Sequence, residues 1–254
     1  MNLTAEQLQK NYKDLFTYIG HYFSGDRKDK LVQFYKKHEE RIILLPASHK
    51  EGYHSAFPGG YVYHVLSVIK NSLKSYELWK EMGSDLKGIT PENVAFVALN
   101  HDLGKIGTEE EVSVFPSKDE WRKKNLGEHY TFNTNLSYMT VPDRSLFLLS
   151  QAGIQMTEDE WIAIRVHDGL YDDANKAYYK SYITENKFRT PLALILHEGD
   201  MRAARIEFEQ QYLPKIGQNN VTAKNKVSTL SKTTKDKALS SVKSEGLKSM
   251  LDNL

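Results

Sequence analysis

The sequence contains no cysteine among its 254 residues. A disulfide framework is therefore excluded, and so are thiolate metal ligands. Any metal ion must be held by histidine, aspartate and glutamate side chains, which favours a hydrolytic or regulatory ion with nitrogen and oxygen ligands. Nine histidines are present.

A long hydrophobic run is also missing. No segment approaches the roughly 20 apolar residues that a membrane-spanning helix needs. Residues 1–10 are too polar for the apolar part of a secretory signal. We therefore expect a cytoplasmic protein with no membrane partner.

Aromatic residues are absent from the last part of the chain. None follows Tyr212, and residues 215–254 hold eight lysines against three acidic residues, which leaves the first 214 residues at about −4. Such a polar segment can bury little surface. We predict one domain over residues 1–214, with helices of residues 1–45 packed on it, and a flexible basic tail over residues 215–254.

The tail has two interpretations. Its lysines can hold nucleic-acid phosphates through counterion release, or they can belong to a solvated terminus that lacks aromatic stacking platforms. Four apolar residues at helical spacing are a candidate docking face for a partner protein, namely Leu247, Met250, Leu251 and Leu254.

Helical periodicity dominates the first 214 residues, and no alternation of apolar and polar residues is long enough for a sheet core. The predicted fold class is therefore all-α. Threonine caps and proline mark several helix starts. The expected helices start at Thr4, cover roughly 28–40, run from the Pro58–Gly60 turn to about Met82, start at Pro91, include 145–151, run from Thr157 to Gly169, and start at Pro191. Residues 109–124 are charged and have no predicted structure.

The most informative motif is His101-Asp102-Leu103-Gly104-Lys105, which closes an apolar helix. A helix end lets two consecutive side chains converge on one ion, and the Asp102 carboxylate can bridge two metals. Taken alone, a histidine on an apolar face fits a core residue as well as a ligand.

Metal-competent residues recur along the chain. Five separated segments carry one on or near an apolar helix: His64, His101 with Asp102, His129, His167 and Asp200. His197 lies three residues before Asp200, and we favour a structural role for it. The recurrence favours a metal site.

The order His64, His101-Asp102, Asp200 resembles the HD-domain metal-dependent phosphohydrolases. Three strings carry the resemblance: residues 53–64, residues 101–105 and residues 191–200. The first is similar to a segment of bacterial HD-domain 3′→5′ exoribonucleases and phosphodiesterases, in which a histidine, a Gly-Gly turn and the first ligand follow one another. The resemblance covers about Glu51 to Arg205.

This resemblance implies an HD-domain helical bundle with a binuclear centre. One ion would be held by His64, His101, Asp102 and Asp200, while Asp102 bridges to a second ion held by His129 and His167. A bridging hydroxide would then attack phosphorus. The two ions are expected to be manganese or iron, and nickel, cobalt and zinc are also compatible.

Four further residues are candidates for catalysis or substrate binding beside Asp102. Lys105 either meets a phosphate oxygen or is a solvated lysine. His54 lines the pocket or protonates a leaving oxygen. Asp168 is a substrate-side candidate, although binuclear relatives often have a second histidine there. Arg202 either binds phosphate or pairs with an acidic neighbour.

The expected function is a phosphodiesterase or 3′→5′ exonuclease acting on nucleotides or single-stranded nucleic acid. One alternative is a mononuclear nucleotidase or nucleoside triphosphate hydrolase, in which His129 and His167 contact phosphate. Another is a non-catalytic protein that binds nucleic acid or a partner.

Overall fold

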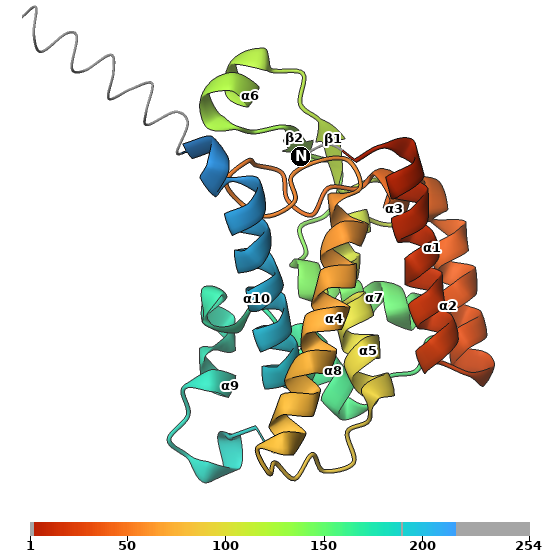
Figure 1. The fold of residues 1–254 in the computed structure, drawn as a ribbon, viewed down its shortest axis with the longest axis vertical. Helices are drawn as coiled ribbons and strands as arrows, with labels where there is room; N and C mark the ends of the chain where they lie inside the picture. Colours follow the sequence, from red (N-terminus) through yellow and green to blue (C-terminus); the bar gives the residue numbers. More distant parts are fainter. Residues whose placement is uncertain (1–2, 189, 217–254) are drawn as a thin grey trace, which may run out of the picture. The chain divides into compact units, whose positions relative to one another are not determined.

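The fold is described from a computed structural model, which covers residues 3–188 and 190–216. Most of this part is helical, as the hydrophobic pattern predicts (Figure 1). The α-helices are α1 (Ala5–Tyr22), α2 (Gly25–Lys37), α3 (Glu39–Leu44), α4 (Gly60–Glu81), α5 (Pro91–Asn100), α6 (Glu120–Leu126), α7 (Val141–Gln151), α8 (Glu158–Arg165), α9 (Lys176–Tyr179) and α10 (Leu192–Gln211). Short 3₁₀ turns are η1 (Leu103–Ile106), η2 (Gly169–Tyr171), η3 (Asp173–Asn175) and η4 (Thr184–Asn186), and the strands are β1 (Val114–Pro116) and β2 (Tyr130–Phe132).

The threonine caps predicted from the sequence begin three of these helices. The hydroxyl groups of Thr4, Thr90 and Thr157 each accept a hydrogen bond from the backbone N–H three residues later, and the side chain of that residue bonds back to the cap. Such a cap stabilises a helix by about 1 kcal/mol. The starts of α1, α5 and α8 are thus fixed locally.

The structure changes the bounds of the helix expected over 28–40 and defines the start of the helix that includes 145–151. The helix expected over 28–40 is two helices, α2 and α3, because the backbone of His38 leaves the helical conformation between them. The helix expected over 145–151 already begins at Val141. Its first turn is set by Pro142 and by the Thr140 hydroxyl, which accepts from the N–H of Asp143.

The helix expected to run from Thr157 to Gly169 ends earlier. α8 stops at Arg165, and Val166 already has non-helical dihedral angles. His167 therefore lies in the turn after α8. The chain reverses there at Gly169, whose φ is +58°, a conformation that glycine adopts without strain.

Helices α4 and α5 pack against each other in the middle of the bundle (Figure 1). Every residue of α5 from Val94 to Asn100 is buried. This burial matches a helix that is apolar on nearly all of its faces. α1 contacts both α4 and α5, and α8 contacts α5, so the C-terminal end of α5 is enclosed by the bundle.

The charged segment 109–124, for which no structure was predicted, contains β1 and the start of α6, and β2 follows it. Residues 114–132 are called the arm below. β1 and β2 are antiparallel, with Val114 opposite Phe132 and Phe115 opposite Thr131. None of the seven residues of α6, all of them described, is buried. The strand pair is too short to make a core, so the fold is mainly α-helical.

The chain divides into two compact units, Met1–Phe208 and Glu209–Leu254. The first contains every element named above except the end of α10. The predicted basic tail, from residue 217 on, lies outside the described residues.

Among the described residues, no helix has both the length and the apolar composition needed to cross a membrane.

Candidate metal centre

Five of the predicted ligands come from four separate parts of the fold and meet at one point. His64 lies on α4, His101 and Asp102 follow the last residue of α5, His167 follows α8, and Asp200 lies on α10. All except Asp200 are buried. These five residues are called the His–Asp cluster below.

The side chains of the His–Asp cluster face one another. Nε2 of His64 lies 3.0 Å from Oδ1 of Asp200 and 3.8 Å from Oδ2 of Asp102. Nε2 of His101 lies 3.5 Å from that same Asp102 oxygen and 3.8 Å from Asp200 Oδ1. Nε2 of His167 lies 3.7 Å from the other oxygen of Asp102. The Asp102 carboxylate therefore faces His64 and His101 with one oxygen and His167 with the other.

The ring of His64 is oriented by a buried carboxylate. Its Nδ1 donates a hydrogen bond to Oε1 of Glu207 at 3.1 Å. Oε2 of Glu207 accepts a second bond of 2.6 Å from the hydroxyl of Ser55. The bond at Nδ1 fixes the orientation of the ring, so Nε2 faces the cluster.

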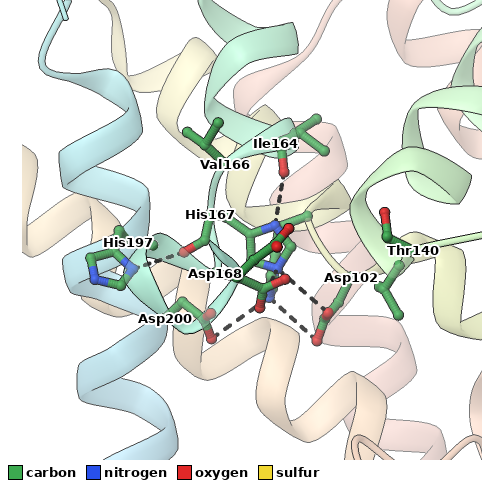
Figure 2. A network of polar contacts seen from close by, with 12 residues as sticks. Asp102, Thr140, Ile164, Val166, His167, Asp168, His197 and Asp200 are labelled. Atoms are coloured by element: carbon green, nitrogen blue, oxygen red, sulfur yellow. Dashed lines mark hydrogen bonds and ion pairs between the residues drawn. The ribbon is translucent and has the colours of Figure 1, made fainter. Parts of the chain in front are cut away.

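Backbone carbonyls orient the other two rings in the same way. Nδ1 of His101 donates to the carbonyl of Ala98 at 2.9 Å, and Nδ1 of His167 donates to the carbonyl of Ile164 at 2.8 Å. Figure 2 shows the bond between His167 and Ile164 and the position of His167 among the aspartates. All three rings therefore turn Nε2 toward the carboxylates.

A divalent transition metal fits this set of donors. The Nε2 atom of His101 is buried and has no hydrogen-bond partner within the described residues, and the buried Nε2 of His64 faces the Asp200 carboxylate at 3.0 Å. A buried nitrogen without a partner is costly in a folded protein. Three imidazole nitrogens and two carboxylates suit manganese, iron, cobalt, nickel or zinc better than magnesium, which prefers oxygen ligands. Three groups of closely spaced ligand atoms lie here: His54 with His64 and Asp102, His64 with His101 and Asp200, and His101 with Asp102 and His167.

The carboxylates of the His–Asp cluster are held in the charged form. Burial alone would raise the pKa of Asp102, but Lys105 and His101 outweigh it and lower that pKa well below the usual range. Burial is likewise outweighed at Asp200 by His64 and His101, and its pKa is lowered. Both side chains are thus available as anionic ligands at neutral pH.

The three histidines respond differently to the same environment. Burial lowers the pKa of His101 to about 4. At His64 burial is outweighed by Glu207 and Asp200, which raise the pKa to about 10. At His167 it is outweighed chiefly by Asp102 and Asp168, and the pKa rises to about 9. In the absence of metal, two of the three rings carry the protons that balance the carboxylates.

His54 and Lys105, the two predicted catalytic partners of Asp102, lie next to the cluster. The ring centroid of His54 is 4.2 Å from that of His64. Burial and the nearby His64 lower the pKa of His54 to about 2, so its ring is neutral and is a poor proton donor. Nζ of Lys105 lies 2.5 Å from Oδ2 of Asp102.

Two predicted residues, His129 and Arg202, have partners outside the cluster. His129 belongs to none of the three ligand groups; its Nε2 lies 3.4 Å from Oε2 of Glu51. The reason is that the chain around it is tied down by backbone pairing, because Glu128 bridges to Lys50 just before β2 begins. The structure therefore does not bring His129 to the His–Asp cluster.

Arg202 and Asp168 have different neighbours. Nη1 of Arg202 donates to the hydroxyl of Ser75 on α4 at 3.0 Å. Asp168 is next to the cluster, with Oδ1 at 3.7 Å from Nε2 of His167 and a side chain that is 44% exposed. Asp168 thus remains a substrate-side candidate, whereas Arg202 makes the hydrogen bond expected of a structural residue.

Two supporting residues were not assigned to the site from the sequence. Glu207 lies seven residues after Asp200 on α10, a spacing that puts both on one helix face and that could have indicated its role. His197 was predicted to be structural, and its Nδ1 donates to the carbonyl of His167 at 2.8 Å (Figure 2). Gly169 leaves the space that the His197 ring fills, since a Cβ at Gly169 would lie 2.3 Å from that ring.

A cavity of about 870 Å³ opens beside the His–Asp cluster. Four residues at or next to the cluster line it, namely His54, Asp102, Lys105 and Asp168. Other walls come from residues 46–53, from the arm and from residues 133–144. A ligand in this cavity reaches Asp102 and Lys105 directly.

Comparisons of the chain with models of protein families, with curated proteins and with solved structures found no match.

Proposed function

We propose that this protein is a metal-dependent phosphohydrolase of the HD type, with one divalent metal held by His64, His101, Asp102 and Asp200. One observation carries the proposal: buried histidine nitrogens converge with two anionic carboxylates beside a cavity. The resemblance of the His101-Asp102 motif and its neighbours to HD-domain enzymes supports it.

The chemistry follows from the residues around the cavity. A bound metal polarises a phosphoryl oxygen and supplies a water of lowered pKa. Lys105 lines the cavity with its ammonium group beside Asp102. This ammonium is available to a phosphate oxygen in the cavity. His54 is neutral and lines the cavity, so it contributes shape rather than a proton.

A single metal is favoured because, among the described residues, all four predicted ligands of the first ion meet at one point, whereas those of the second ion do not. The second set predicted from the sequence needs His129, which lies against Glu51. We therefore favour the nucleotidase alternative, acting on phosphate monoesters of nucleotides.

A two-metal phosphodiesterase is the second candidate. It is favoured by one observation, that Oδ1 of Asp102 faces Nε2 of His167 at 3.7 Å, with Asp168 at the same distance from that nitrogen. In this arrangement the remaining ligands of the second ion would be water or substrate.

Metal content measured beside hydrolysis tests the proposal. Tag-free protein is analysed by elemental mass spectrometry and is assayed with p-nitrophenyl phosphate and bis(p-nitrophenyl) phosphate in the presence of Mn²⁺. We expect about one metal per chain and monoester hydrolysis. Two metals with diester hydrolysis would favour the second candidate. Metal without hydrolysis would favour a binding protein, and a protein that takes up no metal would contradict both enzymes.

The matched variants are Asp102→Asn and Asp173→Asn. The first removes a ligand charge at constant shape, and we expect loss of bound metal and a fall of about a thousandfold in kcat/KM. Asp173 lies on the surface with an 86% exposed side chain that pairs with Lys176. The Asp173→Asn variant should keep both metal and activity.

A further inference from the structure

The lining of the cavity has a polar part and an aromatic part. The polar part is Asp102 and Lys105 beside the His–Asp cluster. The aromatic part, called the aromatic wall below, consists of His49, Tyr53, Phe132 and Tyr138. None of these side chains has a permanent charge.

The centre of the aromatic wall is held in place by backbone bonds between two distant segments. The N–H of Tyr130 donates to the carbonyl of His49 at 3.1 Å, and the N–H of Glu51 donates to the carbonyl of Gly127 at 2.7 Å. The ring of Phe132 consequently lies 4.8 Å from the ring of His49, centroid to centroid. The ring of Tyr53 lies 5.9 Å from His49 on the same segment. The arm thus contributes a fixed ring to the cavity.

The aromatic wall presents apolar surface that the fold itself does not bury. Phe132 is 60% exposed and Tyr53 is 57% exposed. Single exposed aromatics are ordinary on protein surfaces, but several lining one cavity indicate a binding surface. Large flat rings favour a flat ligand, because stacking needs two planar faces.

The charges of the cavity indicate where the ligand's own charge lies. Burial lowers the pKa of His49 from its ordinary value, so its ring is neutral at pH 7. Arg144 also lines the cavity, and its guanidinium donates to the carbonyl of Ser137 at 2.7 Å. Asp102, Asp168 and Asp172 line the cavity too, so a ligand anion meets positive charge only at Lys105, Arg144 and the proposed metal. A ligand with an anionic part and a flat, uncharged part matches both parts of the lining.

We propose that the aromatic wall binds the base of a nucleotide whose phosphate lies at Lys105 and the His–Asp cluster, and that Phe132 and His49 set the preference for nucleotides over phosphate esters without a base. The placement of the phosphate rests on the proposed function. The stacking of the base rests on the wall alone.

Binding to metal-free protein separates the two proposals, because it requires no turnover. EDTA-treated full-length protein is titrated calorimetrically with the four common ribonucleoside 5′-monophosphates and with ribose 5-phosphate as the probe without a base. We expect at least one nucleotide to bind at least tenfold more tightly than ribose 5-phosphate. The Phe132→Ala variant should weaken nucleotide binding about tenfold and leave ribose 5-phosphate unchanged. Phe132→Tyr should retain the nucleotide affinity, because the ring remains.

Phe115→Ala is the matched control. Phe115 is a phenylalanine of the same strand pair, 46% exposed, and it is not among the described residues that line the cavity. Because Phe132 and Phe115 are both substantially exposed, neither truncation should unfold the protein, which circular dichroism checks. Equal weakening by both alanine variants would overturn the proposal, and so would equal affinity for nucleotides and ribose 5-phosphate.

Hydrolysis with Mn²⁺ is measured on the same variants. Nucleotide binding that depends on Phe132, without any hydrolysis, would support the aromatic wall and contradict the enzymatic proposal. Hydrolysis that proceeds equally well on nucleotides and ribose 5-phosphate would support the enzyme and overturn the role of the aromatic wall.

Discussion

Asp102 of the His–Asp cluster and the aromatic wall line one cavity, yet the chain holds the two groups by different means. The cluster residues lie on helices or directly after them, and each of the histidines is oriented by a hydrogen bond at Nδ1. The aromatic wall comes from loops and a short strand pair fastened by a few backbone bonds. Changes near the cluster should therefore affect stability and metal binding together, whereas changes in the arm should affect ligand preference.

The tight contact between α10 and α4 gives the largest expected effect. A Cβ at Gly199 would lie 2.1 Å from Oγ of Ser72 and 2.8 Å from its backbone nitrogen. Gly199→Ala must push the two helices apart and displace Asp200, which follows directly. We expect a loss of about 1–3 kcal/mol in the free energy of unfolding and weaker metal binding, measured by urea denaturation and by calorimetry.

Gly20→Ala is the control for this change. Gly20 also lies in a helix, α1, but a Cβ there meets no atom within 4 Å. Alanine has the higher helix propensity, so this variant should gain up to about 1 kcal/mol. A Gly199→Ala protein as stable as the Gly20→Ala protein would show that α10 can move without cost.

Glu207→Gln tests the orientation of His64. The variant keeps the shape but replaces the charged acceptor of the Nδ1 proton. Loss of such a supporting carboxylate typically weakens metal binding by 10–100-fold, and we expect a loss in that range, measured by competition with a fluorescent chelator. Glu209→Gln, on an exposed position of the same helix, is the control and should leave the affinity unchanged. Unchanged affinity in Glu207→Gln would remove the proposed positioning role.

Metal binding should depend on pH because of the protons that the cluster holds. The pKa values of about 10 at His64 and about 9 at His167 mean that both rings are protonated at pH 8. His64 must lose its proton to bind a metal, and a cation beside His167 favours loss of the second proton. The affinity should therefore rise with pH up to about 9–10 and fall as the pH is lowered.

The number of released protons is measurable by calorimetry in HEPES and Tris, which differ in ionisation enthalpy. Between one and two protons should be released per metal at pH 8. His101, with its pKa of about 4, is already neutral and should release none. Release of less than one proton would contradict the assignment of His64 as a ligand.

The smallest effect is expected on the outer face of the arm. Trp121 on α6 is 64% exposed, so Trp121→Ala should change the free energy of unfolding by less than about 0.5 kcal/mol. Metal affinity should also be unchanged, as thermal unfolding and chelator competition can verify. A larger loss of stability would mean that the arm contributes to the fold as the helices do.

Much of the helical framework was predictable because its signals are local. A threonine cap at Thr4, Thr90 or Thr157 and the proline after Thr90 involve residues within one turn of each other. The break at His38 and the early end of α8 were not predicted, since neither has a strong local signal. The strand pair of the arm was missed because each strand has only three residues.

The residues of the candidate site were predictable where they lie on helices or directly after them. His64, His101, Asp102, His167 and Asp200 were selected by recurrence on or near apolar helices, and the structure brings them together. The selection of His129 followed the same order along the chain, but that residue lies in a loop.

Loops show why order along the chain is not enough. The position of His129 depends on backbone pairing of Glu128 with Lys50, 78 residues earlier in the chain. Glu207 was missed although it lies on a helix. A glutamate near a helix end usually faces solvent. The packing of α10 on α4 buries this one beside His64.

The sequence by itself determined the capped starts of α1, α5 and α8, the absence of thiolate ligands and the set of ligand-competent side chains, because these follow from residue type and local spacing. The tertiary structure decided which of these side chains share one centre, which nitrogen of each histidine faces it, and that aromatic rings from two segments line the same cavity. These properties depend on contacts between residues far apart in the chain, where packing and backbone pairing act and local sequence preferences do not.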